Sequence, residues 1–454
     1  MPLNNDVPKI QRALVLQGGG GLGAYEAGAF KVLYEELPKL DKKNREEGRP
    51  LFDVIAGTSI GAINAAVLVS HFKQNKSWQG AHKKLENFWG HISSDVDVSF
   101  YTRYWKEQHV SYPNAASPEA ARRYYSAKQF QRDGARNVFS PPEIIFDEKF
   151  FDNTLIPNNT WFRYSNDLLR ESVQHIDEET GQRFIDFPIS TNPERGEPRL
   201  LAVSVDVSLG ATVTFDSYSN KSVYGWYDKQ SKKYEEHIVD YQHGMEISHL
   251  MASASIPIFY DYEKIDGRAF WDGAMLSNTP LRELLQHHRD YWHKQRKVEV
   301  PELEVYIVNV WPSKEDNIPS DRDGVVDRYH DIGFSDRTDH DEKVALLVSD
   351  YIEFVNKIRN LALEQITTAQ GQAKFNHAYN AFLNTEGLSR NRKGERRIYK
   401  SLTEGRFKLT KDVFRIERRD DKDNISNKFA DFTTQTISRL IKEGENDARS
   451  MFRA

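Results

Sequence analysis

The feature of this sequence that most constrains its fold is a serine between two glycines, Gly57-Thr58-Ser59-Ile60-Gly61. An apolar run at residues 51–56 precedes it, and a run with helical character at residues 60–68 follows it. A strand that turns sharply into a helix leaves the serine oxygen exposed at the turn, and the flanking glycines permit the tight backbone. The pentapeptide therefore predicts a nucleophile elbow with Ser59 at its apex.

A second strand-loop-helix unit precedes the serine. Residues 12–17 form a compact apolar run, four glycines follow at 18–21, and apolar residues then recur at helical spacing. Pro38 should end this first helix. Because two such units occur in succession, the fold class expected is α/β, a three-layer sandwich with a mainly parallel central sheet.

The remaining chain suggests an insertion and a C-terminal extension. The regular pattern degrades over residues 78–198, which we interpret as a helical insertion that is either a lid over the site or peripheral packing. Strand patterns return at residues 200–215 and 303–311, and the last third is mainly helical. The expected organisation is one domain over residues 12–285, with a helical region, residues 286–454, packed on it.

The glycines after the first strand admit two interpretations. Without a Cβ, residues let backbone N–H groups approach a reacting oxygen, so an oxyanion hole is expected from Gly18, Gly19, Gly20 and Gly21. The spacing Gly18-x-Gly20-x-x-Gly23 also satisfies a dinucleotide-binding fingerprint. That alternative, a nucleotide-dependent oxidoreductase or binding protein, needs an acid at the end of the second strand, where this chain has Thr58-Ser59. The oxyanion interpretation is therefore favoured.

A nucleophilic serine also needs a base, and two kinds of candidate lie downstream. Asp272 stands on a turn signal, Asp272-Gly273-Ala274, directly after two bulky apolar residues. His287, His288 and His293 follow it in the Ser, acid, His order of α/β-hydrolases. Their stretch is polar and typical of a solvated helix, so Asp272 is favoured, and a Ser-Asp-His triad stays as the alternative.

Composition excludes several other classes of protein. The formal net charge of −5 argues against a dedicated nucleic-acid binder, and the absence of cysteine excludes disulfides, thiolate metal ligands and a cysteine nucleophile. No signal-peptide pattern opens the chain, and no apolar run approaches the roughly 18 residues of a membrane span. The expected location is cytoplasmic, with at most a peripheral membrane contact. The basic run at residues 390–397 is a candidate for anionic head groups, although a solvated loop is the simpler interpretation.

Taken together, the glycine loop, the Ser59 pentapeptide and Asp272-Gly273-Ala274 resemble the patatin-like phospholipase family in their order and intervals. The stretch Ser253-Ala254-Ser255-Ile256-Pro257-Ile258-Phe259 is similar too, and the resemblance covers residues 12–285 as motifs. It implies a Ser-Asp dyad without histidine, in which Ser59 is the nucleophile and Asp272 the base. The positions that would support the motifs are Gly23, Gly57, Gly61, Gly273 and Ala274.

The resemblance also implies the chemistry. Family substrates are acyl esters of lipids, cleaved in a phospholipase A or lysophospholipase manner through an acyl-enzyme, and no metal or other cofactor is required. One departure is Leu22, where many members carry Arg or Lys. A charge that would orient an anionic phosphate is absent there, which leaves neutral and lysolipid esters open. A further alternative is a dyad kept inactive until a partner or ligand opens the insertion.

A dyad of this kind predicts a pH dependence. The unperturbed pKa is about 3.9 for aspartate and about 6.5 for histidine. An Asp272 base should therefore stay competent at mildly acidic pH, and kcat/KM should decline only below the pH at which a histidine-dependent hydrolase loses activity.

Overall fold

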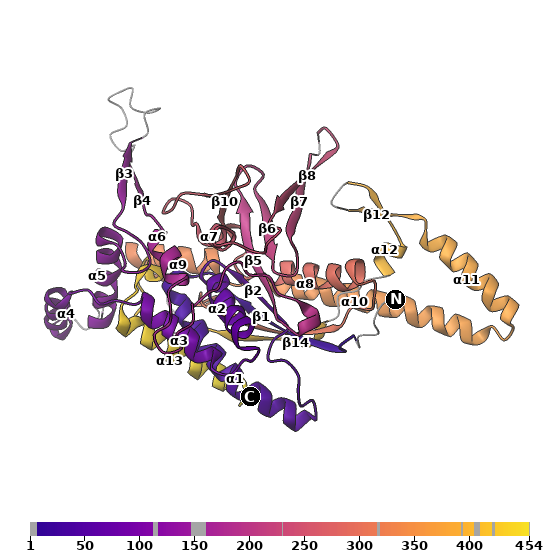
Figure 1. Cartoon of the computed structure of the whole chain (residues 1–454), viewed down its shortest axis with the longest axis horizontal. Coiled ribbons are helices and arrows are strands. Elements are labelled where there is room, and N and C mark those ends of the chain that lie inside the picture. Colours follow the sequence, from indigo (N-terminus) through magenta and orange to yellow (C-terminus); the bar gives the residue numbers. More distant parts are fainter. Residues whose placement is uncertain are drawn as a thin grey trace.

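A computed structural model describes residues 7–111, 117–146, 160–228, 230–315, 318–391, 394–403, 409–419 and 423–453 of the chain (Figure 1). Its centre is one sheet with the strand order β14-β11-β1-β2-β5-β10-β9, and β6 pairs with β5 beside this path. The parallel strands are β1 (Ile10–Leu16), β2 (Val54–Thr58), β5 (Arg199–Asp206), β11 (Glu302–Asn309) and β14 (Leu409–Glu417). The antiparallel strands are β6 (Ala211–Asp216), β9 (Glu263–Ile265) and β10 (Arg268–Asp272).

Helices cover both faces of this sheet. Side chains alternate along a strand, so Leu14 and Leu16 of β1 enter one apolar core while Ala13 and Val15 enter the other. The larger core is formed with α1 (Ala24–Asn44), α2 (Ile60–Asn75), α7 (Ile247–Ala254) and α13 (Thr434–Met451). The smaller core is formed with α8 (Leu281–Arg289) and α10 (Asp339–Gln365). The predicted α/β fold with a largely parallel sheet between helices is confirmed.

Helix α1 runs through the position at which it was expected to end. The prediction that Pro38 ends this helix is wrong, because the helix continues to Asn44 with Pro38 inside it. Leu37 and Asp41 are buried, and the Asp41 carboxylate accepts a hydrogen bond at 2.6 Å from the buried guanidinium of Arg12. These contacts outweigh the cost of a proline in the helix interior.

The expected insertion is an assembly of short elements beside the sheet (Figure 1). It holds α3 (Ala81–Ile92), α4 (Ser99–Ser111), α5 (Pro118–Asp133), β3 (Glu143–Phe146), β4 (Thr160–Arg163) and α6 (Asp167–Val173). A separate hairpin of β7 (Lys221–Asp228) and β8 (Lys233–Asp240) follows β6.

The chain beyond residue 285 adds more than helices. Its β11 pairs with β1 in the middle of the sheet, as the strand pattern at residues 303–311 indicated, and β14, which the sequence pattern missed, pairs outside β11. The other elements are α9 (Arg322–Phe334), α11 (Ala369–Leu383), α12 (Lys400–Thr403), β12 (Glu386–Arg390) and β13 (Arg396–Ile398). The basic run at residues 390–397 falls on the β12–β13 hairpin, and its Arg392 and Lys393 lie outside the described residues.

Helices α1 and α13 touch through two glycines. A Cβ added to Gly28 would lie 1.8 Å from the carbonyl oxygen of Ile441, and one added to Gly444 would lie 2.0 Å from that of Tyr25. We therefore expect Gly28→Ala to lower the free energy of unfolding by about 3 kcal/mol, since backbone must shift to admit the methyl group. Urea denaturation measures this change.

A matched control lies in α3. Gly90 has nothing within 4 Å of an added Cβ, so Gly90→Ala should raise the free energy of unfolding by roughly 0.5–1 kcal/mol through helix propensity alone. Equal effects of the two substitutions would contradict the close packing of α1 on α13.

Candidate active site

Ser59 occupies the turn between β2 and α2. Its φ of 56° and ψ of −129° lie outside the conformations that a serine normally adopts, as expected of a nucleophile elbow. Two interactions hold the turn: the Ser59 N–H donates to Ser253 Oγ at 3.0 Å, and the Ser59 carbonyl accepts from Ala62 N–H at 3.0 Å. The structure therefore has the geometry that the pentapeptide predicts.

The supporting glycines sit where another residue would collide with backbone. A Cβ on Gly57 would lie 2.3 Å from the carbonyl oxygen of Gly61, and a Cβ on Gly61 would lie 2.4 Å from that of Leu16. A Cβ on Gly273 would lie 2.3 Å from the carbonyl oxygen of Val203. The glycines thus let β1, β2, β5 and α2 come close enough to place the serine beside the aspartate.

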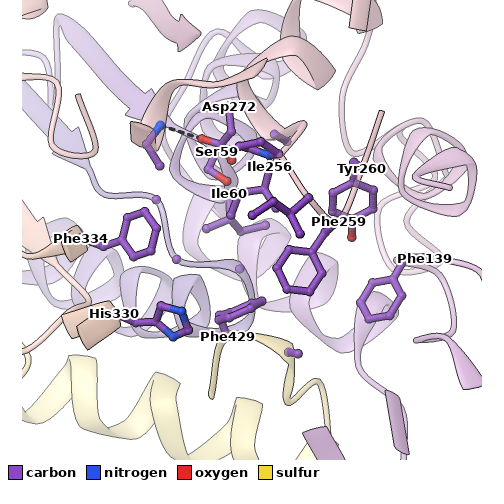
Figure 2. A pocket seen from close by; sticks show the side chains of 18 of the residues that line it. Ser59, Ile60, Phe139, Ile256, Phe259, Tyr260, Asp272, His330, Phe334 and Phe429 are labelled. Atoms are coloured by element: carbon purple, nitrogen blue, oxygen red, sulfur yellow. Dashed lines mark hydrogen bonds between the residues drawn. The ribbon is translucent and has the colours of Figure 1, made fainter. Parts of the chain in front are cut away.

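Asp272 ends β10 and lies beside the Ser59 side chain (Figure 2). Its side chain is fully buried, and its Oδ1 accepts the N–H of Ala274 at 2.8 Å. Its own N–H donates to the carbonyl of Ser255 at 2.9 Å, which ties the turn to the segment after α7. The two residues that the sequence places 213 positions apart are brought together by the pairing of β10 with β5 and of β5 with β2.

Burial controls the acidity of this carboxyl. Desolvation raises the pKa of Asp272 to about 7, against the smaller lowering effects of the Ser59 hydroxyl and the Ala274 N–H. The expectation of a base near its ordinary pKa of about 3.9 is therefore wrong. A carboxylate that must be deprotonated to act as a base is then half-protonated near neutral pH, like a histidine.

The glycine loop lies at the wall of the same site. Gly18, Gly19 and Gly20 line the cavity next to Ser59, while Gly21 lies behind them against the backbone of Asp431. Gly18 donates its N–H to the Asn278 carbonyl at 3.2 Å. Within the described residues, no hydrogen bond occupies the N–H groups of Gly19 and Gly20. Gly23 packs on Ile60, where a Cβ would lie 2.7 Å from the side chain.

Three side chains that the sequence reasoning did not single out hold this loop. The Gly18 carbonyl accepts from Trp311 Nε1 at 2.6 Å and from Asn278 Nδ2 at 3.2 Å. Gln17 is fully buried, and its Oε1 accepts from the N–H groups of Val310 and Trp311 at 2.7 and 3.1 Å. Gln17 is recognisable in the sequence as a polar residue directly after a buried strand. No local pattern distinguishes Trp311.

The serine and the aspartate open onto a cavity of about 420 Å³, within the range of small-molecule sites. Asp272 is the one side chain of the Asp, Glu, Lys or Arg type among its described lining residues. The walls come from the insertion (Ile92, Phe139, Tyr164, Leu169), from the stretch after α7 (Ile256, Phe259, Tyr260) and from the C-terminal region (Phe334, Phe429, Phe432). The insertion therefore forms part of the site rather than packing at its periphery alone.

The candidate histidines do not reach this site. His287, His288 and His293 are absent from the cavity lining, and His288 is buried with its ring against the carbonyl of Pro301. The expectation of a solvated helix is wrong for His288, whose burial lowers its pKa to about 4. Among the described lining residues, His330 is the one histidine, and it lies with Phe334 and Phe429 away from Ser59 (Figure 2).

Leu22 stands at the position where the sequence analysis noted a missing Arg or Lys. Its side chain is fully buried in the core under the glycine loop and does not line the cavity. With no Lys or Arg among the described lining residues, the cavity offers apolar walls and no fixed positive charge.

The fold and the site define an α/β protein with a serine on a strand-to-helix turn beside a buried carboxyl and an apolar cavity. Residues 14–285 match the model of the patatin-like phospholipase family, so the chain belongs to this family, whose members are lipid acyl hydrolases. The crystal structure of VipD from Legionella pneumophila is similar over 98% of this chain and 67% of that chain, with 13% sequence identity and a TM-score of 0.36. No curated protein sequence gives a significant match.

The raised pKa of Asp272 predicts a stability gain when the acid is removed. The folded state binds this proton more tightly than the unfolded state, so the stability it contributes is complete below about pH 3.9 and is lost as the pH rises through about 7. We expect Asp272→Asn to raise the free energy of unfolding at about pH 8, by on the order of 4 kcal/mol at most, and by less at about pH 5. Denaturant titrations at both pH values measure the difference.

Asp206 provides the matched control. It is also a buried aspartate on this sheet, but its pKa is lowered, because the hydrogen bonds from Arg268 and Tyr224 outweigh burial. Asp206→Asn should therefore destabilise the protein at about pH 8. A pH-independent effect of Asp272→Asn would contradict the raised pKa.

Proposed function

We propose that this chain hydrolyses carboxylic esters of lipids through a Ser59-Asp272 dyad and an acyl-enzyme intermediate. The observation that carries the proposal is the side chain of Ser59, held on a strained elbow beside a buried carboxyl at the end of an apolar cavity. Family membership supports lipid acyl hydrolysis in general.

The mechanism follows from the positions of the groups. Asp272 takes the hydroxyl proton as Ser59 Oγ bonds to the ester carbonyl carbon, and the carbonyl oxygen becomes an oxyanion. The N–H groups of Gly19 and Gly20 are the donors proposed to stabilise that charge, and the N-terminus of α2 adds a favourable field. Asp272 then returns the proton to the leaving alcohol oxygen. Water, deprotonated by the same carboxylate, releases the acid and restores the serine.

The cavity supports an acyl chain as the group bound inside. Aromatic and aliphatic side chains surround the space, and burying apolar chain there is favourable in proportion to its area. A phosphate head group has no cationic partner among the described lining residues, so it would lie outside the cavity. Neutral lipids and lysolipids therefore fit the site as well as phospholipids do.

The rim of the cavity supports contact with a lipid surface. Three lining side chains are largely exposed: Ile258 at 75%, Met275 at 50% and Tyr329 at 74%. Leu276 follows Met275 directly, Ile332 lies three residues after Tyr329 on α9, and both are also half exposed. Clustered apolar exposure of this kind marks interaction sites. None of the helices described in the structure has the length and apolarity needed to span a membrane.

The catalytic unit that we propose combines the family segment with the C-terminal region. Strands β11 and β14 complete the sheet, and Phe429 and Phe432 line the cavity. Residues 12–285 and 286–454 would then act as one unit rather than as an enzyme domain with a dispensable extension.

Covalent labelling tests the nucleophile. A fluorophosphonate probe should modify Ser59, as located by mass spectrometry, and Ser59→Ala should abolish both labelling and ester hydrolysis. Asp272→Asn should lower kcat/KM by about 10²–10⁴-fold, the usual contribution of a general base. An adduct on another residue, or full activity in Ser59→Ala, would overturn the assignment.

The pH profile tests the base. Since Asp272 must be deprotonated, kcat/KM should rise with pH through an apparent pKa of about 7. Loss of this limb in Asp272→Asn and its retention in His330→Gln are the expected results. A limb that disappears in His287→Gln or His288→Gln would instead support the Ser-Asp-His alternative.

Vesicle assays test the rim. Leu276→Glu and Ile332→Glu should reduce hydrolysis of lipid in vesicles by about tenfold or more while sparing a soluble short-chain ester, because each places a charge at the lipid boundary. Leu388→Glu is the control, since Leu388 is 93% exposed on β12, which lies on the opposite side of the molecule from α5 and α6 (Figure 1), two helices that contribute to the cavity lining. Equal effects at the rim and on β12 would contradict the proposed contact.

A further inference from the structure

Helix α10 presents an apolar seam to solvent. Six large apolar side chains on one face are 43% to 65% exposed: Val344, Leu347, Tyr351, Phe354, Ile358 and Leu361. A different face of α10 packs within the chain, where Ala345 and Ile352 are buried. The seam is therefore additional to the packing that holds α10 in place.

The spacing of the seam is that of a coiled coil. Its residues follow one another at intervals of three and four in strict alternation over residues 344–361. In heptad notation, the a positions are Val344, Tyr351 and Ile358, and the d positions are Leu347, Phe354 and Leu361. Such side chains act as knobs that need the holes of a facing helix. The seam thus fits a helix better than a flat surface.

The charges beside the seam select the orientation of that helix. The g positions alternate in sign, as Lys343, Asp350, Lys357 and Glu364, and the e positions are apolar, as Val348, Val355 and Ala362. In an antiparallel pair, the g side chains of the two helices face each other. In a parallel pair each g faces the e five residues further along the partner helix, which would set the first three of these charges on each helix against apolar side chains.

One antiparallel register satisfies both the seam and the charges. When Tyr351 packs on Phe354 of a second copy, Val344 packs on its Leu361 and Leu347 on its Ile358. In the same register Lys343 faces Glu364, and Asp350 faces Lys357. This one register gives every apolar layer a partner and every g charge a partner of opposite sign, which supports self-pairing.

We propose that α10 is a dimerisation helix, which pairs antiparallel with α10 of a second copy of this chain about a two-fold axis between Tyr351 and Phe354. The contact is isologous, as in most homodimers. In the single chain, Lys343 pairs with Asp339, and Lys357 pairs with Glu353 at 2.8 Å, with all four side chains at least half exposed. Such surface pairs contribute little and can exchange partners.

The surroundings of α10 allow this pairing. The α10–α11 hairpin extends beyond the sheet on the side of the molecule away from α4 and α5 (Figure 1). A lipid surface suits the helix less well, because α10 carries six carboxylates against three Lys and Arg side chains, whereas helices that lie on anionic lipid are basic.

Charge reversal tests the pair. Sedimentation equilibrium of the full chain should give twice the mass of one chain. Lys343→Glu/Lys357→Glu makes the g positions all acidic, and Asp350→Lys/Glu364→Lys makes them all basic, so each variant alone should lose the dimer. An equimolar mixture should regain it as a heterodimer, which also shows that both variants are folded. A wild-type monomer at every concentration, or dimers unaffected by both variants, would overturn the proposal.

Disulfide trapping tests the register. The chain has no cysteine, so introduced thiols have no competing partner. Oxidation of a mixture of Leu347→Cys and Ile358→Cys should cross-link the two chains, and either variant alone should stay uncrosslinked. A cross-link in Leu347→Cys alone would indicate a parallel pair and overturn the proposal, as would a monomer that binds anionic vesicles through Leu347 and releases them in Leu347→Glu.

Discussion

The molecule is organised around the unfavourable backbone conformation of Ser59. A non-glycine residue at a φ of 56° costs on the order of 1–3 kcal/mol and persists only where its surroundings leave no alternative. Here β2 lies between β1 and β5 in the middle of the sheet, and Ser253 of α7 accepts the Ser59 N–H while donating to Val203 of β5 at 2.6 Å. The neighbouring strands and α7 together hold this turn in place. Because their backbones approach one another closely there, small residues are required at the contacts.

The same enclosure sets the chemistry of the site. Burial removes Asp272 from water, and the resulting rise in its pKa to about 7 would suit the proposed base to neutral pH. In the proposed mechanism this buried carboxylate would lower stability while it raises reactivity, which is the usual compromise at active sites. The apolar cavity is consistent with the same condition, because a positively charged wall would stabilise the carboxylate and lower that pKa.

The C-terminal region supplies part of the cavity wall beside the motif residues. A short 3₁₀ helix, Lys428–Ala430, brings Phe429 to the cavity, and buried Lys428 anchors it to α9 through Asp327 and Asp331 at 3.1 and 2.7 Å. Two carboxylates and one ammonium in a buried cluster fix the geometry of both segments, since an unpaired charge there would be very costly. The cavity therefore depends on residues more than 350 positions after the serine.

The sequence by itself determined the elements that carry the motifs: the strand and glycine loop near the N-terminus, the elbow at Ser59 and the acidic turn at Asp272. These follow from local rules, because periodicity, glycine placement and turn residues act over a few positions. It also contained the heptad of α10, although not the fact that this face stays exposed.

Only the tertiary structure decided the pKa of Asp272, the removal of His288 from the site and the continuation of α1 through Pro38. It likewise assigned Gln17, Asn278 and Trp311 to the glycine loop. Each of these depends on burial or on contacts between distant segments, and no local pattern encodes how much water a folded neighbourhood excludes.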